Sequence, residues 1–285
     1  MMTRLSAGAE WGPPPVIHGE PWWAWTVVAV LVVCLMISAA WVGWMTIRKH
    51  EDALMYWLIM LSGVTILPYF VEPWLDVIGA TTYMTNTLPY VTIADRPLPI
   101  ALPIFVPLVW VGTAPTALVV YEMIKKGWAA WTLIAFALVF GIAECIGEMV
   151  NSHFGLMRYY SNNALVFGVP LPSLVQNGGF LVIIAWVLVA IRPHMHGYRW
   201  AVIPFVAPAA YLAYTIVCTL PSYFAIHLGL APLPSWGLAA LSTALNLLAV
   251  AIVAYSPTCQ RYRDEVGTKV LGPVRTAARQ PVPAA

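Results

Sequence analysis

Seven long apolar segments constrain this chain more than any other feature of its sequence. A helix that crosses a bilayer needs about 20 mostly apolar residues, and seven stretches meet that length. The predicted spans cover residues 22–47, 53–74, 100–123, 128–149, 172–191, 200–225 and 236–255. The sequence therefore predicts an all-α fold, a polytopic transmembrane helix bundle with seven spans.

The composition supports a membrane location. Hydrophobic residues make up 61% of the chain and charged residues only 9%, whereas a soluble domain carries about 25% charged residues. A bilayer explains this balance, because lipid-facing positions need apolar side chains. The segment 22–47 exceeds the signal-peptide core of about 7–15 residues, so we expect a retained anchor helix. We expect a multi-pass protein of the cell membrane, in bacteria the inner membrane, with no nucleic-acid partner.

The basic residues predict how the bundle is oriented. Eleven of the 14 Lys and Arg residues lie in every second connection and in the tail, and only Arg4, Arg96 and Arg158 lie on the other side. The positive-inside rule then places the N-terminus outside and the C-terminus in the cytoplasm. The expected organisation is an extracytoplasmic lead (1–21), a seven-helix transmembrane domain (22–255) and a cytoplasmic, disordered tail (256–285).

Four acidic residues lie at or near membrane depth, toward the predicted outer side. Glu72 and Asp76 are four residues apart at the end of the second span, and Glu144 and Glu148 are four apart in the fourth. This spacing puts each pair on one helical face. Two neighbouring carboxyls in a low-dielectric setting do not both ionise readily, so one tends to keep its proton. The pairs are therefore candidate catalytic acids and bases.

A structural explanation of these acids stays open. They would pair with Arg96, His153 or Arg158 and simply hold the bundle together. Glu122 is set aside, because the two lysines that follow it at the opposite end of its span provide an ion pair.

Polar residues after the fourth span extend the candidate site. By the predicted topology they face the same outer half as the acids. The residues expected to bind substrate are His153, Arg158, Tyr159, Tyr160, Asn163, Asn177 and Tyr214. The proline-rich, amphipathic loop at 75–99 is either a lid over the site or an ordinary interfacial connector.

Several membrane chemistries lack their motifs. The last span contains no lysine for a retinal Schiff base, and the chain has no HxxxH, DDxxD, GxSxG or HExxH pattern. The spacing of Glu144, Glu148 and His153 fits no standard metal site. We therefore expect neither a metal nor a cofactor.

The stretch from Glu144 to Pro172, in which an acidic helix is followed by the G-x-x-x-Y-Y pattern that ends at Tyr160, resembles the polytopic carotenoid hydratase family. With the Glu72–Pro73 pair before a long loop, it is also similar to the avermectin-type spirocyclase family, which the length and span pattern suit better. The similarity spans residues 53–191. It implies acid-assisted addition, cyclisation or dehydration of a lipophilic natural product, as do the membrane-bound meroterpenoid cyclases.

The sequence thus predicts a cofactor-independent membrane enzyme that cyclises, hydrates, dehydrates or isomerises a lipophilic polyketide or terpenoid. One acid of the fourth span would donate a proton and one of the second would accept one, while Tyr and Asn side chains orient the substrate. The alternatives are a proton- or cation-coupled small-molecule transporter and a structural subunit of a membrane complex.

Overall fold

The computed structural model describes residues 14–87, 89–93, 100–103 and 105–270. Within them, seven helical stretches are long and apolar enough to cross a membrane, which confirms the predicted all-α multi-pass bundle. The spans are α1 (Pro21–Ile47), α2 (Ala53–Ile66) continued by the π-helix η1 (Leu67–Val71) and α3 (Glu72–Gly79), α4 (Phe105–Lys125), α5 (Ala130–His153), α6 (Ser173–Ile191) with the 3-10 turn η2 (Arg192–His194), α7 (Ile203–His227) after the 3-10 helix η3 (Gly197–Val202), and α8 (Pro232–Ala254).

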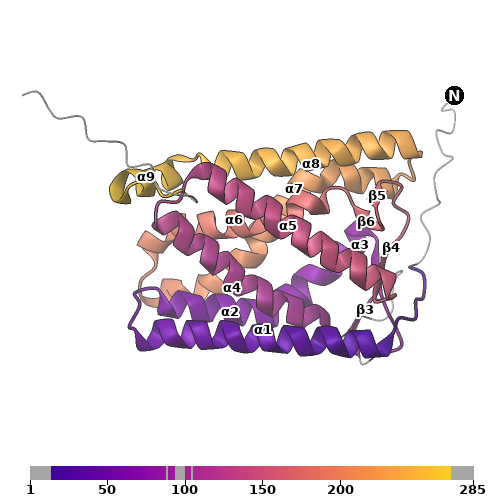
Figure 1. The fold of residues 1–285 in the computed structure, drawn as a ribbon, viewed down its shortest axis with the longest axis horizontal. Helices are drawn as coiled ribbons and strands as arrows, with labels where there is room; N and C mark the ends of the chain where they lie inside the picture. The colour runs from indigo at the N-terminus through magenta and orange to yellow at the C-terminus, as the bar shows by residue number, and fades with distance from the viewer. Residues whose placement is uncertain (1–13, 88, 94–99, 104, 271–285) are drawn as a thin grey trace, which may run out of the picture.

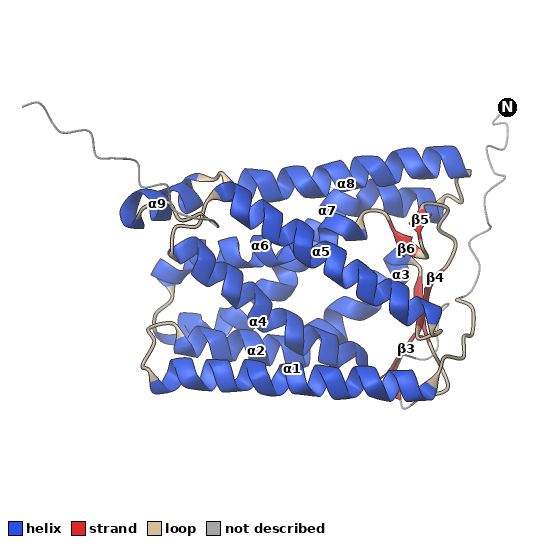
Figure 2. Cartoon of the chain, in the orientation of Figure 1, coloured by secondary structure: helices blue, strands red, loops and turns tan. Residues whose placement is uncertain are grey.

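The two ends of the bundle differ in character (Figures 1 and 2). One end, here called the strand end, carries three short antiparallel pairs. They are β1 (Thr81–Tyr83) with β4 (Met157–Tyr159), β2 (Pro89–Ile93) with β3 (Ile100–Pro103), and β5 (Leu165–Val166) with β6 (Val169–Pro170). The other, here called the basic end, holds Arg48, Lys125 and Arg192. The predicted orientation would put the strand end outside.

Helices α5 and α6 approach each other through small residues. A Cβ atom at Gly178 would collide with the Ala137 carbonyl oxygen, and one at Gly141 would collide with the α6 backbone. Within a bilayer, helices associate through such close backbone packing rather than through the hydrophobic effect. The contact fixes the α6 residue Asn177 opposite the carboxylate face of α5.

The second span contains a widened turn. The Glu72 N–H donates to the Leu67 carbonyl, five residues earlier, and the helix then passes through Pro73 to Gly79. Proline lacks an N–H and crowds the carbonyl four residues back, which a π turn accommodates. The span thus extends past its predicted end at residue 74. It ends at Ala80, which adopts the left-handed conformation with φ 54°.

The connection predicted at 75–99 begins later than expected. Its first five residues belong to α3, and β1 then pairs with β4, so that Tyr83 faces Met157. Residues 100–103 form β3 rather than the start of the third span. Arg96 and the rest of the predicted lid at 94–99 lie outside the described residues.

The prediction of a disordered tail is wrong for its first part. Helix α9 (Pro257–Val266) follows α8, and the Ser256 hydroxyl caps it by accepting from the Cys259 N–H at 3.4 Å. The buried Arg263 donates to the Ala254 carbonyl at 3.1 Å. A capped first turn and a bond back to α8 give this segment fixed partners. Residues 271–285 lie outside the described part.

A buried ion-pair network closes the basic end. Asp52, just before α2, is fully buried and accepts hydrogen bonds from Lys125 at 2.6 Å, Tyr121 at 2.8 Å and Arg192. Burial alone would raise the pKa of Asp52, but the bonds from Lys125, Arg192 and Tyr121 outweigh it and hold the pKa below its ordinary value. The network ties the start of α2 to α4 and to the end of α6.

The α5–α6 contact should be sensitive to a single methyl group. Gly178→Ala forces the helices apart and should lower the free energy of unfolding by about 2–3 kcal/mol, as overpacking does. The control is Gly237→Ala on α8, where a Cβ meets nothing within 4 Å. That change should be neutral or stabilising by up to about 1 kcal/mol. Unfolding in detergent micelles measures both, and equal stability of the two variants contradicts the assigned contact.

Removing the Asp52 charge should destabilise the basic end. Asp52→Asn leaves Lys125 and Arg192 without their buried partner and should cost about 3 kcal/mol, near the lower end for breaking a buried pair. Glu265→Gln is the control, because the Arg261–Glu265 pair is exposed and should contribute below about 1 kcal/mol. Denaturant titration in micelles compares them, and a cost for Asp52→Asn no larger than the control's contradicts the assignment.

The same network predicts a pH dependence. Because the folded-state pKa of Asp52 is lowered, its stabilisation is complete above the ordinary pKa of about 4 and is lost as the pH falls through the lowered value. The wild-type protein should therefore lose this increment on acidification. Asp52→Asn should lack that increment at every pH, and parallel pH–stability curves for the two proteins contradict the assignment.

Candidate active site

A cavity of about 610 Å³ lies in the strand-end half of the bundle. Its described lining comes from six of the seven spanning segments, namely α1, the α2–α3 span, α4, α5, α6 and α7, together with the strands β1, β4 and β6. The volume falls within the range of about 300–1,000 Å³ that is usual for small-molecule sites. A small molecule therefore fits this space.

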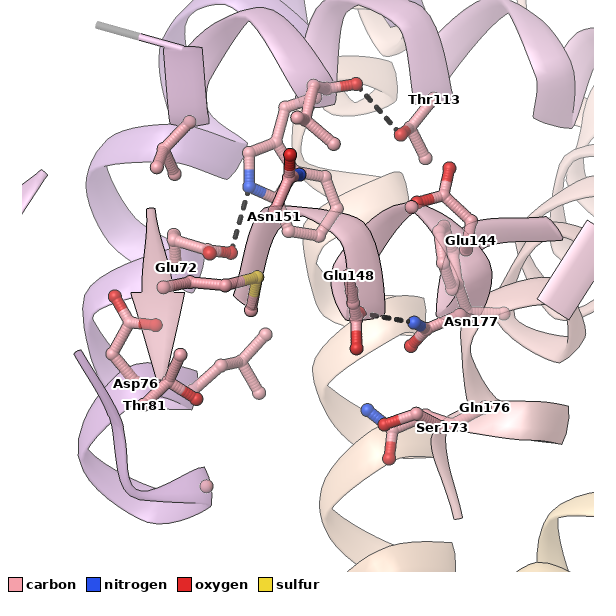
Figure 3. A pocket seen from close by; sticks show the side chains of 18 of the residues that line it. Glu72, Asp76, Thr81, Thr113, Glu144, Glu148, Asn151, Ser173, Gln176 and Asn177 are labelled. Atoms are coloured by element: carbon pink, nitrogen blue, oxygen red, sulfur yellow. Dashed lines mark hydrogen bonds between the residues drawn. The ribbon is translucent and has the colours of Figure 1, made fainter. Parts of the chain in front are cut away.

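The cavity brings together the four acidic residues predicted from the sequence. Glu72 and Asp76 line it from α3, and Glu144 and Glu148 line it from α5. Figure 3 shows the first pair on one side and the second pair on the other. Glu148 interacts electrostatically with both Glu144 and Glu72. The two helices thus contribute to a single acidic site.

Glu72 is held by two neutral donors. The Tyr83 hydroxyl donates to one carboxylate oxygen at 2.7 Å and the Trp110 indole N–H donates to the other at 2.9 Å. Burial, together with the charges of Asp76 and Glu72, raises the pKa of Tyr83 well above its ordinary value. Tyr83 therefore stays a neutral phenol and a hydrogen-bond donor.

Glu148 is held in the same way from the other side. The Tyr159 hydroxyl donates to one oxygen at 3.0 Å, and the Asn177 amide donates to the other at 2.7 Å. Burial and the charge of Glu148 raise the pKa of Tyr159 well above its ordinary value, so this phenol also remains a donor. Each acidic pair thus contains one carboxyl with both oxygens engaged.

The other member of each pair has an oxygen without a partner. Asp76 is 3% exposed, and its Oδ2 accepts no hydrogen bond from the described residues. Glu144 is half-buried and has no hydrogen-bond partner among the described residues. These two carboxyls keep oxygens available to a bound molecule.

No cation compensates the acidic cavity within the described residues. The lining contains no Lys, Arg or His. Arg158 and His153 are exposed, and neither forms an ion pair with the four acids. Among the described residues, nothing supports the alternative that the four acids hold the bundle together by pairing with His153 or Arg158.

The substrate-binding residues predicted from the sequence divide into two groups. Tyr159 and Asn177 line the cavity and hold Glu148. The others do not line it. His153 packs on Phe154, Arg158 lies on β4, Tyr160 packs near Ala80, Asn163 donates to the Leu230 carbonyl at 2.8 Å, and Tyr214 is buried against Gly179.

The α7 wall of the cavity is polar. Pro221 lies within the continuous helix α7, and the Ser222 N–H that follows it donates to the Ser242 hydroxyl of α8 at 3.0 Å. One turn earlier, the Thr219 hydroxyl donates to Gln176 of α6 at 2.8 Å. Ser222, Thr219 and Gln176 line the cavity and supply neutral polar groups.

Tyr83 and Trp110, the two donors to Glu72, were not among the site residues predicted from the sequence. Tyr83 lies eleven residues after Glu72 in a segment expected to be a loop, and Trp110 lies in another span. A tyrosine just beyond an acidic helix end was the available signal for the first. Trp110 is an aromatic residue in an apolar span, as many lipid-facing tryptophans are, so nothing in the sequence marked it as a donor to Glu72.

A second acidic cluster lies at the basic end. His50, Asp52 and Glu122 place ligand atoms within 4.8 Å of one another, an arrangement that can hold a metal ion. The oxygens are already engaged, because Lys125 and Arg192 bond to Asp52, and Glu122 accepts from Tyr56 and pairs with Lys126 at 3.2 Å. An ion-pair network explains this cluster without a metal.

Comparisons with known proteins add no relative to this picture. Neither the protein-family models nor the curated proteins nor the solved structures match the chain. Function is therefore inferred from the geometry of this acidic cavity, whose described lining has no cation, in a bundle of seven apolar helices.

Proposed function

We propose that this protein is an integral membrane enzyme of the cell membrane that needs no cofactor. It would cyclise, hydrate, dehydrate or isomerise a lipophilic polyketide or terpenoid by acid/base chemistry. The observation that supports this most is the gathering of four carboxyl groups in one cavity whose described lining has no cation. Buried ionisable groups at membrane depth are costly and therefore indicate function.

In each acidic pair one carboxyl has both oxygens hydrogen-bonded and the other does not, and this difference suggests their catalytic roles. Glu72 and Glu148 each accept two hydrogen bonds and act as fixed carboxylates. Like charges one helical turn apart are unfavourable, so the proton stays on the neighbouring carboxyl. Glu144 then donates its proton to an alkene, carbonyl or hydroxyl of the substrate. Asp76 takes up the proton released from the product side through its unpartnered oxygen as it passes its own proton to the Glu72 carboxylate, and proton exchange with water restores all three groups.

Aromatic rings in the cavity suit a cationic intermediate. Tyr211 packs edge-on to Trp110 at 5.0 Å and to Phe180 at 4.6 Å between ring centroids, and all three line the cavity. Ring faces stabilise positive charge. Protonation of an alkene creates such a charge, which the fixed carboxylates would also stabilise.

The family resemblance supports the same reaction class. Similarity to the avermectin-type spirocyclase family implies acid-assisted cyclisation or dehydration, and the acids that carry the similarity, Glu72 and Glu144, both line the cavity. Cyclisation with loss or addition of water is therefore the form of the proposal that we favour.

A transporter would need a route through the basic end. The described lining of the cavity stays in the strand-end half, and the acids at the other end are engaged in the Asp52 network. Apolar residues such as Leu118, Leu133 and Leu188 pack between the two regions. This arrangement favours chemistry within one half of the membrane over passage across it.

The carboxyl groups provide the direct test. Glu144→Gln and Asp76→Asn keep the side-chain size but remove the transferable proton, and each should lower product formation at least about 100-fold, the usual contribution of a general acid or base. Mass spectrometry of lipid extracts from cells with and without the protein detects the product as a compound isomeric with its precursor or shifted by water.

The control is Glu265→Gln on the exposed surface of α9, which should leave product formation unchanged. Melting in micelles verifies that each variant folds. Full product formation by folded Glu144→Gln and Asp76→Asn refutes the assigned roles. Proton-driven uptake of a solute by vesicles that hold the protein, with no chemical change in it, refutes the enzyme proposal.

A further inference from the structure

The acidic cavity reaches the lipid-facing side of the bundle between α1 and α5. Helix α1 packs on α4 and α2, whereas α5 packs mainly on α6 and α8. Yet Leu31, Cys34 and Ile37 of α1 and Glu144 and Gly147 of α5 all line the same cavity. Ile37 is 64% exposed, so its helix does not seal the cavity from the outside.

Two glycines keep this opening clear. A Cβ atom at Gly112 of α4 or Gly147 of α5 would meet nothing within 4 Å, and both residues line the cavity. At Gly141 and Gly178, in contrast, a Cβ would collide with backbone. The first two glycines therefore serve no close helix contact. The groove that these two glycines line together with Leu31, Cys34 and Ile37 is here called the lateral groove.

The depth of the lateral groove restricts what passes through it. Gly147 lies six residues and Glu144 nine residues from the strand-end terminus of α5, which corresponds to about 9 and 14 Å along the helix. At that depth the surrounding medium is hydrocarbon, where a charged group costs at least about 2.5–3.5 kcal/mol. A hydroxyl or carbonyl group passes at a lower cost.

The charge of the cavity restricts the substrate further. Its described lining offers four carboxyl groups and no cation, so it repels phosphates and carboxylates. Two of the four already receive two hydrogen bonds each from the protein, so they need no cationic ligand. An alcohol, ketone or ether fits both the remaining oxygens and the apolar groove.

We propose that the lateral groove admits an uncharged, long-chain lipophile from the bilayer, with its polar end directed to Glu144 and Asp76 and its chain between α1 and α5. This inference deepens the proposed function, on which it rests, by naming the entry route and the charge class of the substrate. The groove separates the cavity from water while leaving it accessible from lipid.

Phenylalanine at the groove glycines tests the route. A Cβ at Gly112 or Gly147 meets nothing within 4 Å, so the ring of Gly112→Phe or Gly147→Phe is placed to fill the groove. A helical glycine is a poor helix former, so replacement does not weaken the helix. Gly237→Phe on α8 is the matched control. It lies five residues from the strand-end terminus of its helix, has nothing within 4 Å of its Cβ position and is outside the cavity.

The probe is a long-chain alcohol that carries a photoreactive diazirine, added to vesicles containing the protein. On illumination it should label α1, α4 and α5 peptides of the groove. Labelling should fall at least about tenfold in both groove variants, equivalent to about 1.4 kcal/mol in affinity, and stay unchanged in Gly237→Phe. The matching alkyl phosphate and alkyl trimethylammonium should label these peptides at least about tenfold less than the alcohol.

A second measurement leaves the sequence unchanged. Cys34 is half-exposed in the groove, whereas the other three cysteines are buried. Alkylation with a bulky lipophilic maleimide should therefore modify Cys34 selectively and reduce photolabelling as the phenylalanine variants do. This measurement tests the route even where a variant folds poorly.

The outcomes separate the groove from the chemistry. Equal labelling of Gly147→Phe and Gly237→Phe, or unchanged labelling after Cys34 alkylation, refutes the groove. Equal or stronger labelling by the phosphate or the ammonium probe refutes the uncharged class. Blocked labelling in the groove variants with full product formation in Glu144→Gln supports the groove and refutes the catalytic proposal. If Glu144→Gln loses product while Gly147→Phe keeps both labelling and product formation, the catalytic proposal is supported and the groove is refuted.

Discussion

The close backbone contact between α5 and α6 is the constraint on which the site depends. Within lipid no hydrophobic effect draws helices together, so the contact needs residues without side chains, here Gly141 and Gly178. Glu144 and Glu148 follow Gly141 by three and seven residues, positions on the same helical face. Asn177 adjoins Gly178 and reaches Glu148 at 2.7 Å. The position of one acidic pair is thus set by the absence of side chains at Gly141 and Gly178.

The two ends of the molecule treat acidic residues in opposite ways. At the basic end Asp52 and Glu122 are met by Lys and Arg, which neutralise them and stabilise the bundle. At the strand end Tyr, Trp and Asn hold Glu72 and Glu148, and these donors position a carboxylate without cancelling its charge. Proton chemistry needs the second arrangement, because a neutralised carboxylate is a poor base.

Much of the fold and the centre of the site follow from local sequence patterns. Span length and apolar composition were enough to predict the seven helices, and four-residue spacing was enough to predict that each acidic pair shares a face. The approach of the two pairs across the bundle depends on tertiary packing that no local pattern encodes. Trp110 reaches Glu72 from 38 residues away, and Arg192 reaches Asp52 from 140.

The less accurate expectations have a common physical cause. His153, Arg158 and Asn163 are polar and close in sequence to Glu148, which suggested that they would share its site. Instead, His153 is exposed at the end of α5 and Arg158 is exposed on β4, while Asn163 bonds to the Leu230 carbonyl in a neighbouring loop. The helical turn of the tail was hidden by its polar composition, although Ser256 and Pro257 form a standard helix start.

The widened turn at Leu67–Val71 also sets the phase of the second span. Each residue of an α-helix advances by about 100° around the axis, and a π turn absorbs one residue without that advance. A helical wheel drawn through the whole span would therefore misplace the end that bears Glu72 and Asp76 relative to the buried face of α2. Glu72 and Asp76 point into the cavity only because the π turn contains this one additional residue. A regular α-helix through the same residues would turn both carboxyls by about 100° around the axis. Deletion of one residue from the turn, in contrast, would restore a regular helix and leave the direction of both carboxyls unchanged.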